Sequence, residues 1–294
     1  MPELPEVETI RRIVSDQLTG RRVESVELTL PKLMRASPIA SLAPIVGESV
    51  EHARRRAKIL MIEFSNDLTL LIHFKLSGQL AVLHPDGGRG VAGHPVPNPL
   101  GPYPHRATHV IFQMSGDVTV YYSDVRQFGW LRLLPSIDVN AAINAFGFGP
   151  EAGGDVDVDA VALALTLARR SVPIKLALLD QTVLAGLGNI YVDEALYAAE
   201  IHPTTPANQL DEPAIARLAE TIPWALDEGL AQGGAKIIHQ RAFPQNGFPR
   251  VHGRQGLDCP HCGATIAKIR VGSRGTYLCP NCQTLPTVEN RIPR

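Results

Sequence analysis

Apolar residues recur at helical spacing at the start of the chain, with polar residues between them. The apolar positions lie three or four residues apart: Leu4, Val7, Ile10, Val14 and Leu18. Pro5 suits the first turn of a helix, and Gly20 is a stop signal soon after the last apolar position. The pattern therefore predicts an amphipathic helix that begins near Leu4 and ends before Gly20.

Short apolar runs typical of β-strands follow through the first half of the chain. They cover Arg22–Leu30, Ile59–Phe64, Thr69–Phe74, Gln79–Leu83, His109–Met114, Val118–Ser123 and Trp130–Leu134. Residues 66–67 and 115–117 separate two pairs of these runs, as hairpin turns do. Repeated short strands predict a β-sandwich or barrel. Residues 84–105 hold too much glycine and proline for regular structure, which predicts a mobile loop.

Helical periodicity replaces the strand pattern after a stretch rich in glycine and aspartate at residues 146–159, which is typical of a linker. Helical spacing then covers Val161–Arg169, Ile174–Asp180, Ile190–Ala199 and Pro213–Ala231. These patterns predict an α+β protein with two domains. The expected segments are a β-sandwich over 1–135, a linker over 136–159, a helical part over 160–255, and a cysteine-containing part with the tail over 256–294.

Composition agrees with this division and says less about function. The chain has 294 residues, of which 45% are hydrophobic, enough for two buried cores. We find no apolar run long enough to span a bilayer and no cationic start with an apolar signal segment. A soluble cytoplasmic protein without a membrane partner is therefore expected. The net charge of −1 argues weakly against a nucleic-acid partner.

Basic residues nevertheless gather in two parts of the chain. One run consists of residues 54–56 and Lys58. The other lies at the C-terminal end, where the acidic residues are Asp258 and Glu289. Its basic members are Lys236, Arg241, Arg250, Arg254, Lys268, Arg270, Arg274, Arg291 and Arg294. Two basic regions of this kind fit an anionic partner such as DNA.

The cysteines give the strongest spacing signal. They form two Cys-x-x-Cys pairs separated by sixteen residues: Cys259, Cys262, Cys279 and Cys282. Four thiolates satisfy the tetrahedral preference of Zn²⁺ and leave no open coordination position, so the spacing predicts one structural zinc ion. A redox pair and chance clustering are the alternatives.

The first residues carry a candidate nucleophile. If Met1 is removed, Pro2 becomes an N-terminal secondary amine with a pKa near ~8, so part of it is neutral at pH 7. Its condensation with an aldehyde-like sugar carbon gives a permanently cationic iminium, because no N–H remains. Glu3 is one peptide away and can act as general acid and base. The alternative is an ordinary helix start, in which Glu6 and Glu8 favour the positive end of the helix dipole.

The opening Met-Pro-Glu-Leu-Pro-Glu-Val-Glu-Thr resembles that of the formamidopyrimidine-DNA glycosylase and endonuclease VIII family of base-excision enzymes. Residues 187–194 resemble the family's helix-two-turn-helix, and residues 55–58 resemble its Arg-Arg-Ala-Lys segment. The likeness extends over essentially the whole chain. It implies a β-sandwich domain with an N-terminal helix, followed by a helix-two-turn-helix domain and a zinc-finger β-hairpin.

The resemblance also assigns roles to single residues. It implies that Pro2 attacks the deoxyribose, that Glu3 moves protons, and that Glu6 supports the pocket. The residues implied to contact phosphates are His73, Asn189, Lys58 and Arg274. Lys58 and Arg274 are also implied to belong to the catalytic group, because they lie beside the lesion. The residues implied to fill the space of an extruded base are Leu76, Arg126 and Phe128.

Ordinary local explanations stand beside these roles. Leu76 and Phe128 fit a hydrophobic core, His73 fits a strand, and Asn189 fits a helix cap. Arg274, near the tip of the expected hairpin, fits a solvated side chain.

Some positions depart from the family pattern. Leu76 stands where formamidopyrimidine enzymes usually have methionine, a small change because both are apolar and of similar length. Gln127 stands where the family commonly has a phosphate-binding arginine, so we expect a slightly shallower salt dependence of DNA binding. Residues 236–254 occupy the place of the lesion-capping loop and diverge from it, which leaves the lesion and the opposite-base preference open.

The resemblance implies a monomeric, bifunctional DNA glycosylase and abasic-site lyase of the bacterial cytosol and nucleoid. Its partner would be double-stranded DNA with abasic sites or oxidised purines, namely 8-oxoguanine and formamidopyrimidines. A Schiff base on Pro2 would lead to β,δ-elimination. An endonuclease VIII-type enzyme for oxidised pyrimidines is the alternative within the family, and Leu4, with Arg126 and Phe128, favours the purine class. A zinc-stabilised DNA-binding protein without activity is the alternative of another class.

Overall fold

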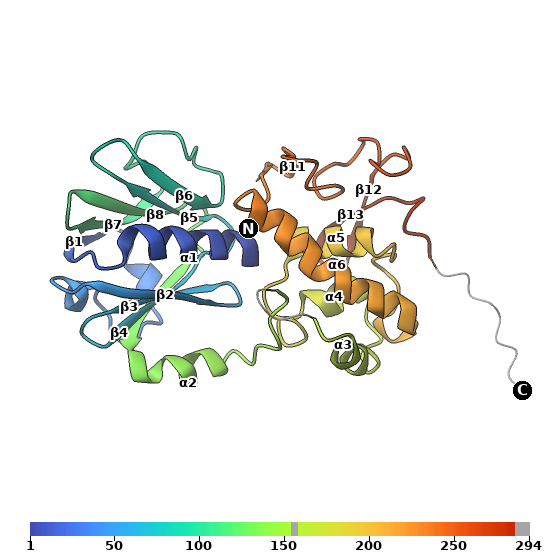
Figure 1. Ribbon diagram of the computed structural model, residues 1–294, viewed down its shortest axis with the longest axis horizontal. Helices are drawn as coiled ribbons and strands as arrows, with labels where there is room; N and C mark the ends of the chain where they lie inside the picture. Colours follow the sequence, from blue (N-terminus) through green and yellow to red (C-terminus); the bar gives the residue numbers. More distant parts are fainter. Residues whose placement is uncertain (154–157, 286–294) are drawn as a thin grey trace, which may run out of the picture. The chain divides into compact units, whose positions relative to one another are not determined.

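The computed structural model describes residues 1–153 and 158–285, which form two compact units (Figure 1). The first unit contains Met1–Phe148 and Gly229–Ile238. The second contains Gly149–Glu228 and the described residues from His239 onward. Part of the expected linker and the end of the tail, with Glu289, Arg291 and Arg294, lie outside the described residues.

Two antiparallel sheets build most of the first unit. Their strand orders are β1-β7-β8-β5-β6 and β2-β3-β4-β9. The strands are β1 (Val23–Leu28), β2 (Val50–Arg56), β3 (Ile59–Phe64), β4 (Leu68–His73), β5 (Gly78–Leu83), β6 (Arg89–Gly93), β7 (Thr108–Met114), β8 (Val118–Asp124) and β9 (Trp130–Pro135). The expected hairpin turns at residues 66–67 and 115–117 connect β3 to β4 and β7 to β8. The expected β-sandwich is confirmed.

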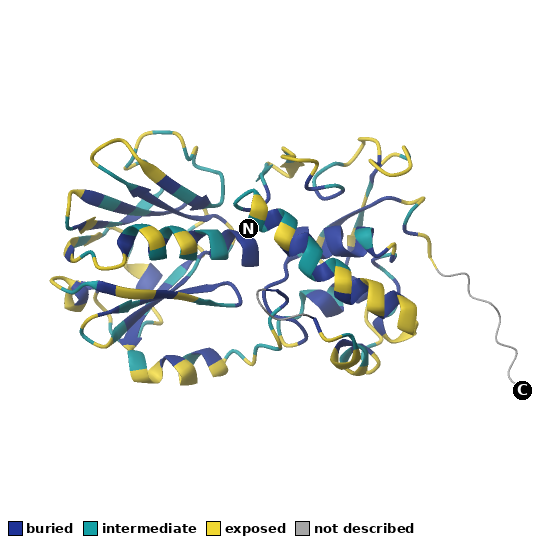
Figure 2. Cartoon of the chain, viewed as in Figure 1, coloured by how far each residue is buried: buried dark blue, intermediate teal, exposed yellow. Residues whose placement is uncertain are grey.

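Helix α1 (Leu4–Leu18) covers one edge of each sheet, because it packs against the edge strands β2 and β6 (Figure 1). The apolar stripe that predicted this helix is buried, and exposed positions alternate with it along the outer side (Figure 2). A sheet edge covered in this way offers no free backbone groups to another strand. The same helix therefore closes the sandwich and carries Pro2 and Glu3 at its start.

The expectation that residues 84–105 lack regular structure is wrong, since β6 lies among them and pairs with β5. Glycine permits this close packing. A Cβ at Gly90 would lie 2.8 Å from Gln17 Nε2 of α1, and a Cβ at Gly93 would lie 2.6 Å from the Gly78 carbonyl oxygen. The small residues that resemble loop signals in the sequence let β6 approach its neighbours.

Strand β2 and helix α2 were also not predicted by the sequence pattern. Strand β2 contains the basic run at residues 54–56 and pairs with β3. Its consecutive charged residues do not show the apolar pattern of a strand. Helix α2 (Val139–Asn144) follows a short 3₁₀ turn (Ser136–Asp138) within the segment expected to be a linker. Its buried Val139 and Ile143 pack against the outer face of the second sheet.

The second unit is mainly helical and ends in a β-hairpin. Its helices are α3 (Ala160–Leu167), α4 (Ile174–Leu179), α5 (Asn189–Ala198) and most of α6 (Glu212–Ala231). The hairpin consists of β12 (Ala267–Val271) and β13 (Arg274–Leu278). Strand β11 (Arg241–Ala242) lies in the segment expected to cap the lesion, as does β10 (Ile237–Ile238), which belongs to the first unit. The expected α+β class is confirmed. Among the described residues, no helix has the length and apolar character needed to cross a membrane.

Candidate active site

Pro2 and Glu3 lie at the buried start of α1. Pro2 is buried, and Glu3 is only 1% exposed. Glu3 is the N-cap residue, and its backbone N–H donates a hydrogen bond of 2.8 Å to Glu6 Oε2, within a capping box. A capping box fixes the direction in which the chain enters a helix. The candidate nucleophile and its carboxylate neighbour are therefore held by the helix that they precede.

The second carboxylate oxygen of Glu6 binds another part of the same unit. Glu6 Oε1 accepts a hydrogen bond of 2.8 Å from the backbone N–H of Ala235. Gly234 has a φ of +100°, and a Cβ there would lie 2.6 Å from Glu6 Cγ. Only glycine allows this approach. Glu6 thus connects the start of α1 to residues 229–238.

Lys58 follows β2 and directly precedes β3, as the sequence predicts, and is only 8% exposed. The arginines before it are bound within the unit, Arg54 to Glu63 and Arg55 to Glu8. The run at residues 54–56 is therefore not a continuous unpaired basic patch.

His73 ends β4 and lies opposite Ile59, the residue after Lys58. Burial, and then the charges of Lys75 and Lys58, lower the pKa of His73 to about 3. Its Nδ1 accepts a hydrogen bond of 3.0 Å from the Lys75 backbone N–H, so the proton of the neutral ring lies on Nε2. A neutral histidine in this form can donate one hydrogen bond to a phosphate oxygen.

Leu76 and Phe128 are not core residues, so the local alternative for them is wrong. Leu76 is 36% exposed and Phe128 is 53% exposed. The Arg126 guanidinium lies 5.1 Å from the centre of the Phe128 ring. Exposed apolar side chains beside an arginine suit insertion into a DNA base stack. We call residues 125–129 the wedge loop.

Asp124 shapes the wedge loop and was not among the predicted site residues. Its buried carboxylate accepts hydrogen bonds from the backbone N–H of Arg126 (3.1 Å) and of Gly129 (2.8 Å), and from the Ser77 hydroxyl. Ser77 is next to Leu76, so one side chain links both parts of the wedge. An aspartate directly before a loop that ends in glycine is the signal that would have identified it.

In the second unit, Asn189 and Arg274 lie on two elements that are bonded together. Asn189 begins α5, and its Nδ2 donates a hydrogen bond of 2.9 Å to the carbonyl oxygen of Gly275. Arg274 is the residue before Gly275 and opens β13, opposite Val271. In this structure the Asn189 amide supports the hairpin that carries Arg274, which neither the cap explanation nor the phosphate role anticipates.

A buried charge network holds the same hairpin. Lys175 and Asp193 are fully buried, and Lys175 Nζ lies 2.6 Å from Asp193 Oδ1. Asp193 Oδ2 binds His252 Nδ1 at 2.7 Å and accepts from the Tyr277 backbone N–H at 3.1 Å. Lys175 Nζ also donates to the Gly275 carbonyl at 3.3 Å. None of these residues was predicted, and the signal for them in the sequence is a charged residue within the apolar pattern of each of two helices, α4 and α5.

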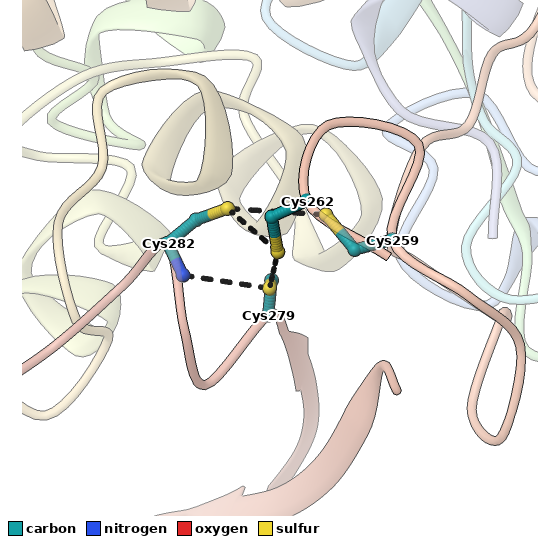
Figure 3. Close-up of side chains that lie close together, drawn as sticks. All are labelled: Cys259, Cys262, Cys279 and Cys282. Atoms are coloured by element: carbon teal, nitrogen blue, oxygen red, sulfur yellow. Dashed lines mark hydrogen bonds between the residues drawn. The ribbon is translucent and has the colours of Figure 1, made fainter. Parts of the chain in front are cut away.

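The four cysteines meet at one point, as predicted (Figure 3). Their sulfur atoms all lie within 4.8 Å of one another, with pairs at 3.5 and 3.9 Å. Tetrahedral zinc with Zn–S bonds of about 2.3 Å needs sulfur atoms about 3.8 Å apart, so the cluster fits this ion. The Tyr197 hydroxyl lies 3.2 Å from Cys259 Sγ, which links α5 to the cluster. Burial raises the pKa of Tyr197, so its hydroxyl stays protonated and can donate to a thiolate.

Three family models match the chain. They describe the formamidopyrimidine-DNA glycosylase N-terminal domain at residues 1–131, its H2TH domain at 148–241, and a zinc finger found in FPG and IleRS at 256–285. A formamidopyrimidine-DNA glycosylase of Streptococcus thermophilus is 35% identical over 288 residues, which cover 96% of this chain and 99% of the relative. The chain belongs to the formamidopyrimidine-DNA glycosylase family. The resemblance inferred from the opening residues is confirmed.

Other members of the family match over the same length. One from a Methylobacterium species is 38% identical over 301 residues and covers 97% of this chain and 100% of its own. A Lactococcus lactis Fpg in complex with DNA that contains an abasic site superimposes with a TM-score of 0.83 at 32% identity, over 97% of this chain and 100% of that chain. MutM in complex with DNA that contains carbocyclic 8-oxo-G gives a TM-score of 0.82 at 34% identity and the same coverage.

Proposed function

We propose that this chain is a monomeric, bifunctional DNA glycosylase and abasic-site lyase that removes oxidised purines from double-stranded DNA. The observation that carries the proposal is the buried start of α1, where Glu6 holds Pro2 and Glu3 in place. Solved relatives bound to DNA with an abasic site or an 8-oxoguanine analogue support the class of substrate.

The proposed reaction begins at the Pro2 nitrogen, once Met1 has been removed. The nitrogen attacks C1′ of the extruded nucleotide, a C1′–N bond forms, and the damaged base leaves with the electron pair of the glycosidic bond. Glu3 takes the proton from the attacking Pro2 nitrogen and gives it to the ring oxygen O4′ as the C1′–O4′ bond breaks, which leaves a cationic iminium on Pro2. Loss of a proton from C2′ expels the 3′ phosphate, and a second elimination expels the 5′ phosphate. Water then hydrolyses the iminium and frees Pro2.

The other residues bind and distort DNA in this proposal. Lys58 and His73 in the first unit, and Asn189 and Arg274 in the second, bind phosphates near the lesion. Leu76, Arg126 and Phe128 fill the space that the extruded base leaves. Arg274 depends on the hairpin that Asn189 and Lys175 support.

Each segment of the chain has its own role in this proposal. Residues 1–135 carry the chemistry, 136–159 connect, 160–255 bind DNA, and 256–294 contain the zinc finger. One zinc ion bound by the four cysteines would be structural, since it has no open position for a substrate.

A competition between lesions tests the proposal. The chain with a free Pro2 is incubated with duplexes that contain 8-oxoguanine opposite cytosine or thymine glycol, and strand products are measured under single-turnover conditions. We expect faster excision of 8-oxoguanine and products with phosphate at both new ends. A clear preference for thymine glycol would assign the chain to the endonuclease VIII class. Binding without any excision would leave only a zinc-stabilised DNA-binding protein.

A further inference from the structure

The hydroxyl of Tyr122 is a buried polar group to which the proposed reaction assigns no role. Tyr122 lies on β8 and is fully buried in the core of the first unit, beside Phe74, with 5.8 Å between the two ring centres. Its hydroxyl oxygen is shielded from water and has no hydrogen-bond partner among the described residues. An unpaired buried hydroxyl destabilises a fold, and phenylalanine would fill the same space without that cost. A partner that the hydroxyl gains in another arrangement of its surroundings would explain why it is there.

The Tyr122 hydroxyl lies directly against Gly129, the last residue of the wedge loop. A Cβ built on Gly129 would lie 1.9 Å from Tyr122 Oη, which leaves no room for a side chain. The same Cβ position is 3.0 Å from Asp124 Oδ2 and 3.2 Å from the carbonyl oxygen of His73. The hydroxyl, the carboxylate and the end of the wedge loop therefore meet at one point.

The Asp124 carboxylate is an acceptor close to this hydroxyl. Asp124 Oδ2 accepts a hydrogen bond of 2.8 Å from the Gly129 backbone N–H, and a carboxylate oxygen has a second lone pair for another donor. Burial, and then the charge of Asp124, raise the pKa of Tyr122, so the hydroxyl keeps its proton and can donate. In this structure Gly129 packs against both groups, and they are not bonded to each other.

The wedge loop needs a second arrangement to enter DNA. In this structure the Arg126 guanidinium covers one face of the Phe128 ring, at 5.1 Å from its centre. A ring inserted between two bases has its faces against those bases, so Phe128 cannot enter the stack and keep Arg126 over its face. The loop therefore rearranges on insertion, and Gly129 at its end is the residue that packs on the Tyr122 hydroxyl.

We propose that Tyr122 is a positioning residue for base extrusion: as the wedge loop enters the stack, Gly129 moves off the hydroxyl, and Tyr122 Oη donates a hydrogen bond to Asp124 Oδ2. This bond holds the carboxylate, and with it the Arg126 N–H and the Ser77 hydroxyl that it binds, in the inserted arrangement. Tyr122 is buried and acts through Asp124 without touching DNA. The inference rests on the proposed extrusion of a damaged base.

Removal of this one oxygen tests the role. Single-turnover excision of 8-oxoguanine from duplex DNA, and cleavage at an existing abasic site, are measured for the full chain, for Tyr122→Phe and for Tyr121→Phe. Tyr121 is the preceding residue of β8 and lies on the opposite face of the strand, so it is the matched control for a lost hydroxyl.

We expect Tyr122→Phe to slow excision about tenfold, the effect of one hydrogen bond to a charged group, and to leave abasic-site cleavage nearly unchanged. Tyr121→Phe should change neither rate. An unchanged excision rate in Tyr122→Phe, or an equal loss on both substrates, would overturn the inference.

Urea unfolding without DNA separates this role from ordinary support of the core. The hydroxyl has no partner among the described residues, so Tyr122→Phe should unfold at the same urea concentration as the wild type or at a higher one. A lower midpoint in Tyr122→Phe would show that the hydroxyl supports the folded core, and the inference would be wrong.

Fluorescence of 2-aminopurine beside the lesion reports extrusion itself. A chain with an N-terminal extension before Pro2 carries out no chemistry in the proposed mechanism, so its fluorescence rise on binding measures the unstacked state alone. In that chain Tyr122→Phe should reduce the rise severalfold and leave the dissociation constant for undamaged duplex unchanged. A full rise in the variant would contradict the inference although the proposed function stands. Failure of the wild type with a free Pro2 to excise 8-oxoguanine contradicts the proposed function itself.

Discussion

Glu6 places two separate backbone segments, because each oxygen of its carboxylate accepts a hydrogen bond from a different one. The sequence pattern predicted Pro2 and Glu3 as a chemical pair from their types alone. It did not predict Gly234 and Ala235, since the 229–238 segment is distant along the chain and glycine carries no signal for its partner. At the scale of single residues, local chemistry was readable and long-range hydrogen bonds were not.

Replacement of Glu6 tests this placement. Glu6→Gln keeps the shape but exchanges one acceptor for a donor, so one buried N–H loses its partner. We expect the free energy of unfolding to fall by about 1–3 kcal/mol, measured by urea denaturation, and the rate of base excision to fall as well. Glu24→Gln, at an exposed position of β1, is the control and should leave both quantities unchanged. Wild-type stability in Glu6→Gln would show that the two hydrogen bonds do not hold the site.

The neutral state of His73 predicts a pH dependence of stability. The folded chain takes up the proton only near a pKa of about 3, whereas the unfolded chain takes it up near about 6.5. The contribution is complete above pH 6.5 and is lost as pH falls, by about 1.4 kcal/mol per pH unit between the two values. His73→Gln should therefore show a shallower loss of stability than the wild type between pH 6 and pH 4. Parallel curves would contradict a neutral buried His73.

The elements that the sequence predicted are helices and strands with an apolar pattern, and strand β6, which it missed, contains glycines. Helix α1 and strands β7 and β8 follow from periodicity, because one face of each is buried against the core. Strand β3 follows from a continuous apolar run, because both of its faces are buried. Strand β6 and the wedge loop depend on glycines and on the Asp124 carboxylate, whose partners no local pattern reveals. At the scale of elements, the sequence predicted what is periodic and missed what is held by single contacts.

The wedge loop supplies a prediction at this scale. Asp124→Asn places an amide N–H where the loop needs an acceptor, so Leu76 and Arg126 lose their fixed relation. We expect kcat/KM for 8-oxoguanine in duplex DNA to fall by up to about 100-fold. Cleavage at an existing abasic site should fall much less, because no base has to be extruded. Asp117→Asn, in the exposed turn between β7 and β8, is the control. Equal loss on both substrates would count against a role in extrusion.

The zinc-finger hairpin supplies a second prediction at the scale of elements. Four thiolates without their ion repel one another once deprotonated, so removal of zinc with a chelator should unfold the hairpin that carries Arg274. We expect about one zinc per chain by elemental analysis, and a dissociation constant for DNA about tenfold or more higher after removal. Addition of zinc should restore the affinity. Unchanged DNA binding by the metal-free chain would separate the finger from DNA recognition.

At the scale of the whole molecule, the sequence predicted the fold class but not the buried charge network of the second unit. The α+β class, the sandwich, the helical part and the cysteine cluster were all predicted, because burial and ligand spacing leave periodic traces in a sequence. The network of Lys175, Asp193 and His252 was not, since buried ion pairs join residues far apart in the chain. The position of the hairpin, and with it the surroundings of Arg274, depends on that network.

The central claim is that the Pro2 nitrogen forms a covalent bond with the sugar. Borohydride reduction during incubation with abasic-site duplex DNA tests it most directly, with intact-mass measurement to establish that Met1 is absent. The account predicts a stable adduct of one chain and one DNA strand, joined at Pro2. A chain with an N-terminal extension before Pro2 should bind the same DNA and form no adduct. Absence of an adduct with a free Pro2, or an equal yield from the extended chain, would contradict the account.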